Sequence, residues 1–263
     1  MSNPLSTVRQ NLSSVVGDLI IGTFTGGSTS TGIDRMLTKA DDYYNDHKFR
    51  CYIYAGTGIG EERLVNDWDL DCCQLTLTPI FTAAIDSTSK YELHSFFTED
   101  EYRRAINLAI ETLAEKYLID ITDVTTVLVA SVWEYTLPTT MTYVHTVTTE
   151  NAAGGGIFKK AGEVDNRDWE LIASRKLKLH DGRYSITAGK DLRIEGQGRQ
   201  EQVTSDSDII YLPQDWVVQK AITFLPQNRI QSNKLDDTYR QALILSSDEP
   251  RNWPHPKAQR VLE

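Results

Sequence analysis

The sequence lacks the residue patterns from which catalytic chemistry is usually recognised. Its five histidines include no H-x-x-x-H or H-E-x-x-H pair, and no G-x-S-x-G motif or Walker loop is present. A carboxylate pair for glycoside hydrolysis forms only in space and leaves no sequence pattern, and nothing in the chain favours one. The sequence therefore predicts a protein that is not an enzyme and that has no cofactor and no metal.

Cysteine is scarce, and long apolar runs are missing. The chain has three cysteines, Cys51, Cys72 and Cys73, with no C-x-x-C pair among them. This argues against a disulfide framework or a zinc site, so we expect reduced thiols packed as small apolar side chains. No stretch approaches the ~18 apolar residues of a membrane-spanning helix, and the first residues show no signal-peptide pattern. We expect a protein that crosses no membrane.

Basic residues are outnumbered by acidic ones. The chain has 27 Lys and Arg against 37 Asp and Glu, a net charge of −10. Surfaces that grip nucleic acid are usually basic, so this balance argues against tight DNA or RNA binding. With 263 residues, 40% of them hydrophobic, the chain is long enough for one large domain or two of about 100–150 residues.

A glycine-rich segment at residues 56–60 (GTGIG) has a superficial likeness to a nucleotide-binding loop. It lacks the third glycine at the required spacing, and Glu61 and Glu62 follow it. Two carboxylates would repel a phosphate. The segment is therefore interpreted as a turn between strands.

Three alternating aspartates, Asp67, Asp69 and Asp71, resemble the start of an EF-hand loop. The sixth position of such a loop would be Cys72 instead of Gly, and the twelfth would be Thr78 instead of Glu. Calcium needs the bidentate carboxylate at that last position. A weak cation site remains the alternative to a solvated acidic run.

The clearest helix in the sequence covers residues 98–118 (TEDEYRRAINLAIETLAEKYL). Thr98 followed by Glu101 is a capping-box pattern, and acidic residues in the first turn suit the positive end of the helix dipole. Apolar residues recur at helical spacing, and no Gly or Pro interrupts them. The pattern predicts a helix that serves as the packing spine of the protein.

The elements predicted on either side of this helix indicate the fold class. A short helix at residues 4–16 is followed by strands at residues 18–24, 49–55, 62–67, 73–78 and 89–94. Short strands within residues 123–212 are followed by helices at residues 213–225 and 235–245. We predict an α+β protein, with an N-terminal small β barrel or sandwich module and then a helical-bundle body with a β-sheet insertion.

The predicted domains follow from this order. They are the β module with its leading helix at residues 1–94, the body at residues 95–247 with its insertion at about 123–212, and a tail at residues 248–263. The tail has three prolines, so we expect it to be extended. An extended tail adds little to a folded core, and its deletion is expected to leave a folded protein.

Candidate contacts lie on the helix, in the tail and in a glycine loop. Consecutive glycines resist a single conformation, so the loop is expected to be flexible. Trp and Arg dominate interface energetics, so a tail with both is a candidate anchor. The helix face is a candidate subunit contact, with a solvated face as the alternative. The residues are Arg103, Arg104, Glu111 and Glu115 on the helix, Arg251, Trp253, Pro254 and Pro256 in the tail, and Gly154, Gly155 and Gly156 in the loop.

Five tryptophans and twelve tyrosines raise a second possibility. Exposed aromatic rings such as Trp68 and Trp169 would build a sugar-binding platform, and the protein would then be a carbohydrate- or receptor-binding tail structural protein. The other interpretation is core and interface packing, because most of the tryptophans lie within predicted elements beside apolar neighbours. A hydrolase is the weakest of the alternatives.

Short motifs along the chain also resemble a known family. They are YRRAINLAI at residues 102–110, VWEYTLP at 132–138, YVHTV at 143–147, DWEL at 168–171 and SDIIYLP at 207–213. In this order they resemble tailed-bacteriophage head-to-tail connector (adaptor or neck) proteins. Residues 22–93 resemble a small β module of tailed-phage structural proteins.

The resemblance implies a virion structural protein at the head–tail junction, assembled in the host cytoplasm. It implies a ring, commonly a dodecamer, that contacts the portal protein and tail or neck proteins. Double-stranded DNA would pass through this ring without specific binding. An acidic surface fits that implication, because negative charge summed around a ring keeps DNA from adhering.

Overall fold

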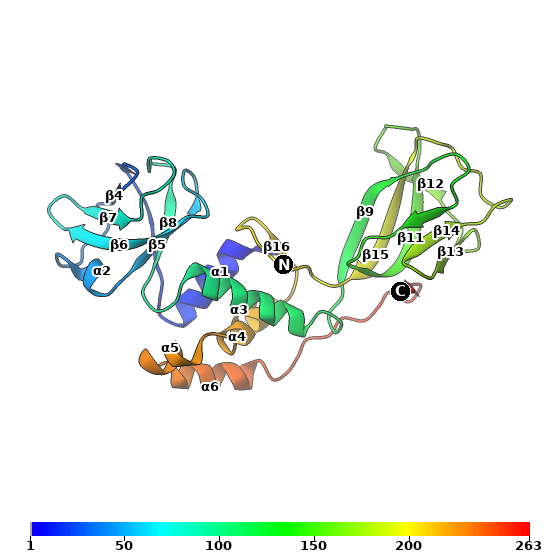
Figure 1. Cartoon of the computed structure of the whole chain (residues 1–263). Coiled ribbons are helices and arrows are strands. Elements are labelled where there is room, and N and C mark those ends of the chain that lie inside the picture. The colour runs from blue at the N-terminus through cyan, green and yellow to red at the C-terminus, as the bar shows by residue number, and fades with distance from the viewer. Residues whose placement is uncertain (1) are drawn as a thin grey trace. The chain divides into compact units, whose positions relative to one another are not determined.

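In the computed structural model, which describes residues 2–263, the chain forms two compact units (Figure 1). Unit 1 contains the described residues up to Glu111 together with Gln202–Glu249. Unit 2 contains Thr112–Glu201 and Pro250–Glu263. Each unit is therefore assembled from two separate stretches of the chain, and each is described by itself below.

Unit 1 is built on a seven-stranded antiparallel sheet with the order β2-β8-β5-β6-β7-β4-β3. Residues alternate between buried and exposed along strands such as β7, so one face of the sheet covers a core that includes Phe24, Trp68 and Tyr91. The strands are β2 (Ile20–Thr23), β3 (Gly26–Gly27), β4 (Thr31–Ile33), β5 (Arg50–Ala55), β6 (Glu62–Asp69), β7 (Gln74–Thr78) and β8 (Lys90–His94).

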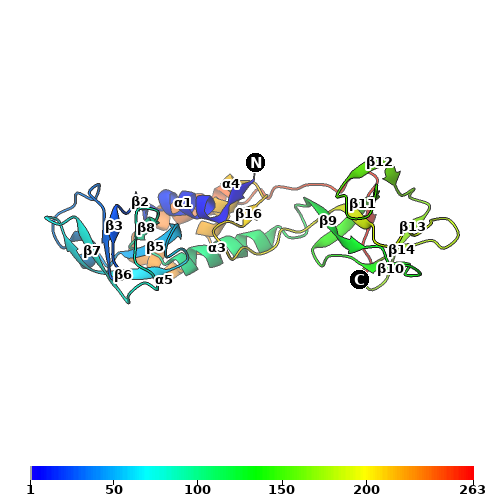
Figure 2. The ribbon, with the colours of Figure 1, turned by 90° about the horizontal axis from the view of Figure 1, so that it is seen from above.

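The helices of unit 1 are mostly short. Within this unit α1 contacts α4, α4 contacts α6, and α1 lies beside α3 (Figure 1, Figure 2). The short strand β1 (Asn3–Pro4) pairs with β16 (Ile209–Ile210). The helices are α1 (Leu5–Val15), α2 (Tyr43–Asp46), α3 (Glu99–Thr112), α4 (Gln214–Ile222), α5 (Gln227–Ser232) and α6 (Asp236–Leu245).

The predicted spine helix is α3, and its capping box is confirmed. The Glu101 backbone N–H donates to the Thr98 Oγ1 at 3.2 Å, and the Thr98 backbone N–H donates to the Glu101 Oε2 at 2.9 Å. The helix ends at Thr112, earlier than predicted. Beyond it, the Lys116 N–H bonds to the Leu113 carbonyl three residues back, the tighter spacing of a helix that is ending.

Unit 2 consists of two antiparallel sheets around one core. The larger sheet has the order β12-β11-β15-β9, and β17 also pairs with β11; the smaller has the order β10-β14-β13. Met141, Ile194, Trp169 and Leu177 from the two sheets share the core. The strands are β9 (Ile119–Val127), β10 (Glu134–Thr136), β11 (Met141–Glu150), β12 (Phe158–Glu163), β13 (Trp169–Ile172), β14 (Lys176–Leu179), β15 (Asp191–Gly198) and β17 (Gln259–Arg260).

The predicted fold class is wrong. The chain is mostly β-sheet, with 32% strand and 21% helix, in several large antiparallel sheets. It is not a helical-bundle body behind a small N-terminal barrel, because the residues assigned to an insertion form a separate unit with its own core. The helices after Pro213 are also too short for a bundle, since Pro226 interrupts them and leaves helices of 9, 6 and 10 residues.

The expected extended tail belongs to the core of unit 2. Its strand β17 pairs with β11 through Tyr143 and Arg260, and Val261 is only 5% exposed. The Arg175 N–H donates to the Leu262 carbonyl at 2.9 Å. The expectation that the tail adds little to a folded core is therefore wrong, because its last residues supply both a strand and a core side chain.

Smaller predictions have mixed outcomes. Residues 56–60 form the expected turn between β5 and β6. All three cysteines are free, with Cys51 buried as expected but Cys72 exposed. Strand β12 was not predicted, because its sequence FKKAGE alternates weakly. None of the helices in the described part of the chain has the length and apolarity to cross a bilayer.

Candidate interaction surfaces

The polar face of α3 is largely engaged within unit 1. The Arg103 Nη2 contacts the Asp100 Oδ1 at 3.0 Å, and the Arg103 Nη1 donates to the Thr204 carbonyl at 3.3 Å. The Arg104 Nη2 contacts the other Asp100 oxygen at 2.9 Å, although the Arg104 side chain is 76% exposed. Arg103 therefore ties α3 to the loop before β16, and Arg104 is the more accessible cation.

The two glutamates predicted for this face lie in different units. The Glu111 carboxylate accepts a hydrogen bond from the Gln202 side-chain amide within unit 1. Glu115 is exposed and belongs to unit 2, beyond the end of α3. The four helix residues thus do not form one surface within a single unit.

The tail presents an exposed tryptophan on a fixed backbone. The Asn252 N–H donates to the Lys116 carbonyl at 3.1 Å, and its side-chain amide donates to the Leu118 carbonyl at 2.6 Å. The adjacent Trp253 is 74% exposed. Of the other predicted tail residues, Arg251 and Pro256 are exposed and Pro254 is half-buried. A large aromatic ring that is exposed to solvent, on a backbone fixed by hydrogen bonds, is typical of an interface anchor.

The predicted glycine loop surrounds a carboxylate. The Gly154 N–H donates to the Glu150 Oε2 at 3.0 Å, the Gly156 N–H donates to the other oxygen, and the Asp191 N–H donates at 3.2 Å. Burial works against the charge, yet these N–H groups lower the pKa of Glu150. Gly154 and Gly156 have φ of 71° and 63°, a conformation that favours glycine. All three glycines are exposed, including Gly155.

The sequence reasoning missed an exposed apolar surface on α6. Leu243, Ile244 and Leu245 are 46%, 73% and 61% exposed, and the buried residue of this helix is Ala242. A signal was present in the sequence. Three consecutive helical residues span too wide an arc to face one core, so a run of large apolar residues at this position predicts outward-facing side chains.

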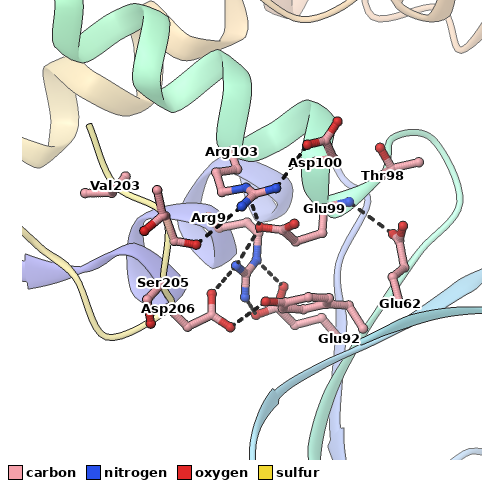
Figure 3. A network of polar contacts seen from close by, with 12 residues as sticks. Arg9, Glu62, Glu92, Thr98, Glu99, Asp100, Arg103, Val203, Ser205 and Asp206 are labelled. Atoms are coloured by element: carbon pink, nitrogen blue, oxygen red, sulfur yellow. Dashed lines mark hydrogen bonds and ion pairs between the residues drawn. The ribbon is translucent and has the colours of Figure 1, made fainter. Parts of the chain in front are cut away.

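A buried polar network centred on Arg9 was also missed (Figure 3). The Arg9 guanidinium, from α1, is fully buried and donates to both Glu92 oxygens on β8, at 2.8 and 2.9 Å. It also bonds to Asp206 and lies 3.5 Å from the Glu99 carboxylate of α3. Arg9 follows Leu5 by four residues on the buried face of its helix, which was the available signal.

The network continues behind Glu92. The His94 Nε2 lies 3.0 Å from the Glu92 Oε2, and the His94 Nδ1 lies 2.7 Å from the Asp18 carbonyl oxygen. The Asp18 carboxylate accepts from the Phe97 N–H at 3.0 Å and from the Tyr102 hydroxyl at 2.8 Å. Every group has protein partners, so we interpret the network as a lock between α1, α3 and the sheet of unit 1.

Hydrogen bonding decides the charge state of Glu92. Burial raises the pKa of a carboxyl group, but hydrogen bonds from His94 and Arg9 outweigh it and lower the pKa of Glu92 from 4.5 to about 2. Burial works against the charge of Arg9, but the carboxylates of Glu92 and Asp206 outweigh it and raise the pKa of Arg9. The pair is therefore ionised and fully desolvated.

The two tryptophans considered for a sugar-binding platform are buried. Trp68 and Trp169 are 1% and 2% exposed, and Trp216 is buried as well. The rings of Trp68 and Trp169 pack in the cores of units 1 and 2, as the packing interpretation predicted. Stacking on a sugar needs an exposed ring face, which Trp68 and Trp169 do not offer.

Comparison with known proteins adds no assignment. Neither a scan against protein-family models nor a search of curated proteins finds a match for this chain. Within residues 2–263, no group of three His, Cys, Asp or Glu side chains is arranged to hold a metal ion. The function is therefore inferred from the chain's own surfaces and from the motif resemblance.

Proposed function

We propose that the protein is a virion structural protein, a ring-forming head-to-tail connector subunit of a tailed bacteriophage. In this role it joins the portal to the tail and lines the DNA passage, and it has no enzymatic activity. The observation that carries the proposal is the exposed run Leu243, Ile244 and Leu245 at the end of α6. Adjacent large apolar side chains held in water favour association, because covering them removes apolar area from solvent.

Further features of the surface support assembly. Trp253 is 74% exposed and Arg104 is 76% exposed, and both residue types are enriched at protein interfaces. A subunit that contacts its neighbours through two different surfaces builds a ring when the rotation between copies closes. The net charge of −10, repeated around a ring, disfavours adhesion of the DNA that passes through it.

The carbohydrate-binding alternative lacks a specific observation in its favour, because Trp68 and Trp169 are buried. The motif order and the exposed end of α6 both favour a connector subunit. The head–tail junction, the portal as partner and the dodecamer are parts of the same proposal.

The variant Ile244→Asp tests the contribution of α6. We expect it to weaken assembly into rings or with the portal by about tenfold or more, because a charge replaces an apolar contact. Thermal unfolding of the variant should match the wild type, since the side chain is 73% exposed. The measurement is the mass distribution of the purified chain, alone and mixed with portal protein.

A matched control is Met36→Asp, which places the same charge at an exposed methionine (84%) that follows β4 in the same unit. It should assemble as the wild type does. If the wild type and Ile244→Asp assembled equally, the end of α6 would not be an assembly contact, and the proposal would lose the observation that carries it.

A further inference from the structure

The larger sheet of unit 2 has two open edges. Strand β9, nine residues long, pairs with β15 from Ile119 to Val127. Strand β12 pairs with β11, with a register shift between Thr148 and Glu150. Among residues 2–263, no strand pairs with the outer side of either β9 or β12. An unpaired strand edge offers backbone donors and acceptors to another strand.

The strand directions allow one copy of this sheet to follow another. All neighbouring strands in the order β12-β11-β15-β9 are antiparallel. With four antiparallel strands in this order, the two edge strands β12 and β9 run in opposite directions. A second copy placed edge to edge in the same orientation would therefore set its β12 antiparallel to β9, which continues the alternation.

The charges of the two edges are complementary. The exposed acid of strand β9 is Asp120, because Asp123 is buried and its carboxylate accepts hydrogen bonds from Thr125 and Thr126. Strand β9 has no basic residue, whereas β12 contains the exposed Lys159 and Lys160 and one acid, Glu163. Lysines on an edge strand discourage pairing with neutral or basic strands. An acidic strand attracts these lysines instead. Pairing of β9 with β12 is therefore favoured over pairing of β12 with β12 or of β9 with β9.

Both edges also expose apolar side chains. Val124 and Val127 on β9 are 46% and 47% exposed, and Ile157, directly before β12, is 55% exposed. In an antiparallel pair the end of β9 lies beside the start of β12, so these side chains would approach each other. Pairing would then cover apolar area at both edges.

We propose that β9 of one copy pairs antiparallel with β12 of the next copy, so that the sheet continues from subunit to subunit. This inference rests on the proposed function, because it supplies the head-to-tail contact of the ring. The contact joins two different edges of the same chain. It is therefore heterologous, and a ring closes without leaving either edge unpaired.

Substitutions of opposite charge at Val124 test the pairing in the full chain. Val124→Lys faces the lysines of β12 and should weaken self-association by about tenfold or more, because like charges across strands repel. Val124→Glu introduces a side chain of similar length to lysine, but its charge attracts the lysines of β12. Its self-association should therefore stay close to that of the wild type. Val129→Lys, 52% exposed and outside β9, is the control and should associate normally.

A charge exchange identifies the second edge. The double variant Lys159→Glu, Lys160→Glu makes β12 acidic, so it should lose self-association with the acidic β9. Adding Val124→Lys to this double variant should restore self-association, because β9 then carries the opposite charge. The readout is ring mass by sedimentation, with thermal unfolding to confirm that each variant folds. If wild type, Val124→Lys and the double variant form equal rings, the edge pairing is wrong while the connector proposal stands. If the wild type forms no ring, alone or with portal protein, both are wrong.

Discussion

At the scale of single residues, the stability of unit 1 depends on the pair Arg9 and Glu92. We expect Glu92→Gln to lower the free energy of unfolding by about 3 kcal/mol, because it removes the carboxylate that pairs with two nitrogens of the buried Arg9 guanidinium and leaves only Asp206 and Glu99 as its charge partners. Urea unfolding measures this. The control Arg240→Gln removes one partner of an exposed ion pair at 3.9 Å and should change little. Equal effects of the two substitutions would contradict the lock.

The same pair predicts how acid affects unit 1. The pKa of Glu92 falls from 4.5 to about 2 on folding. A depressed carboxyl pKa adds stability that is fully present above 4.5 and is lost as the pH falls toward 2. The wild type should therefore lose stability between those values. The variant Glu92→Gln lacks this carboxyl group, so its stability should not show this loss between pH 4.5 and 2. Unfolding midpoints of both proteins, measured across that pH range, test the difference.

In unit 2, His145 predicts a second pH effect. Burial lowers the pKa of His145 below 6.5, and the ring of His255, 4.9 Å away, lowers it further. A depressed histidine pKa adds stability that is present above 6.5 and is lost as the pH falls through the folded value. His145→Phe should flatten this decline. Unfolding of unit 2 between neutral and mildly acidic pH, followed by its own tryptophans, is the measurement.

At the scale of elements, strand β17 makes the tail part of unit 2. Val261 is 5% exposed in the core, and its N–H donates to the Thr142 carbonyl at 2.8 Å. Val261→Ala removes two buried carbons and should cost about 1.5 kcal/mol, while Leu262→Ala, at a side chain that is 51% exposed, should cost much less. Deletion of residues 251–263 should destabilise unit 2 strongly. A deletion variant with unchanged unfolding would restore the original expectation of an independent tail.

Elements set by local patterns were predictable from the sequence. The capping box of Thr98 and Glu101 fixed the start of α3, and alternation identified strands such as β7 and β8. Burial of Trp68 and Trp169 followed from their apolar neighbours. Each of these features depends on residues close together along the chain, which is why the sequence reveals them.

Features set by distant residues were not predictable. The network joins Arg9 to Glu92 and Asp206, which are separated by 83 and 197 positions in the chain. The division into units depends on residues 112–201 pairing among themselves, and β17 reaches β11 from the tail. Strand pairing over such separations depends on tertiary packing, which periodicity does not encode. The fold class was wrong for this reason.

At the scale of the whole molecule, the surfaces outside the two cores are the candidates for contact with other molecules. The exposed features are the end of α6, Trp253, and the open edges β9 and β12. If paired charges at the edges help hold subunits together, raising the salt concentration should loosen self-association, because ions screen exposed charges. Sedimentation at low and high salt measures this, and tighter association at high salt would assign the contact to apolar burial alone.

Ring assembly is the central property of a connector subunit, and the mass of the purified full-length chain tests it. Mass measurement with negative-stain imaging, on the chain alone and mixed with portal protein, reports both stoichiometry and closure. We expect closed rings of a single size that bind the portal. A chain that remains monomeric at every concentration, and that enters no ring or particle with the portal, would contradict the proposed function.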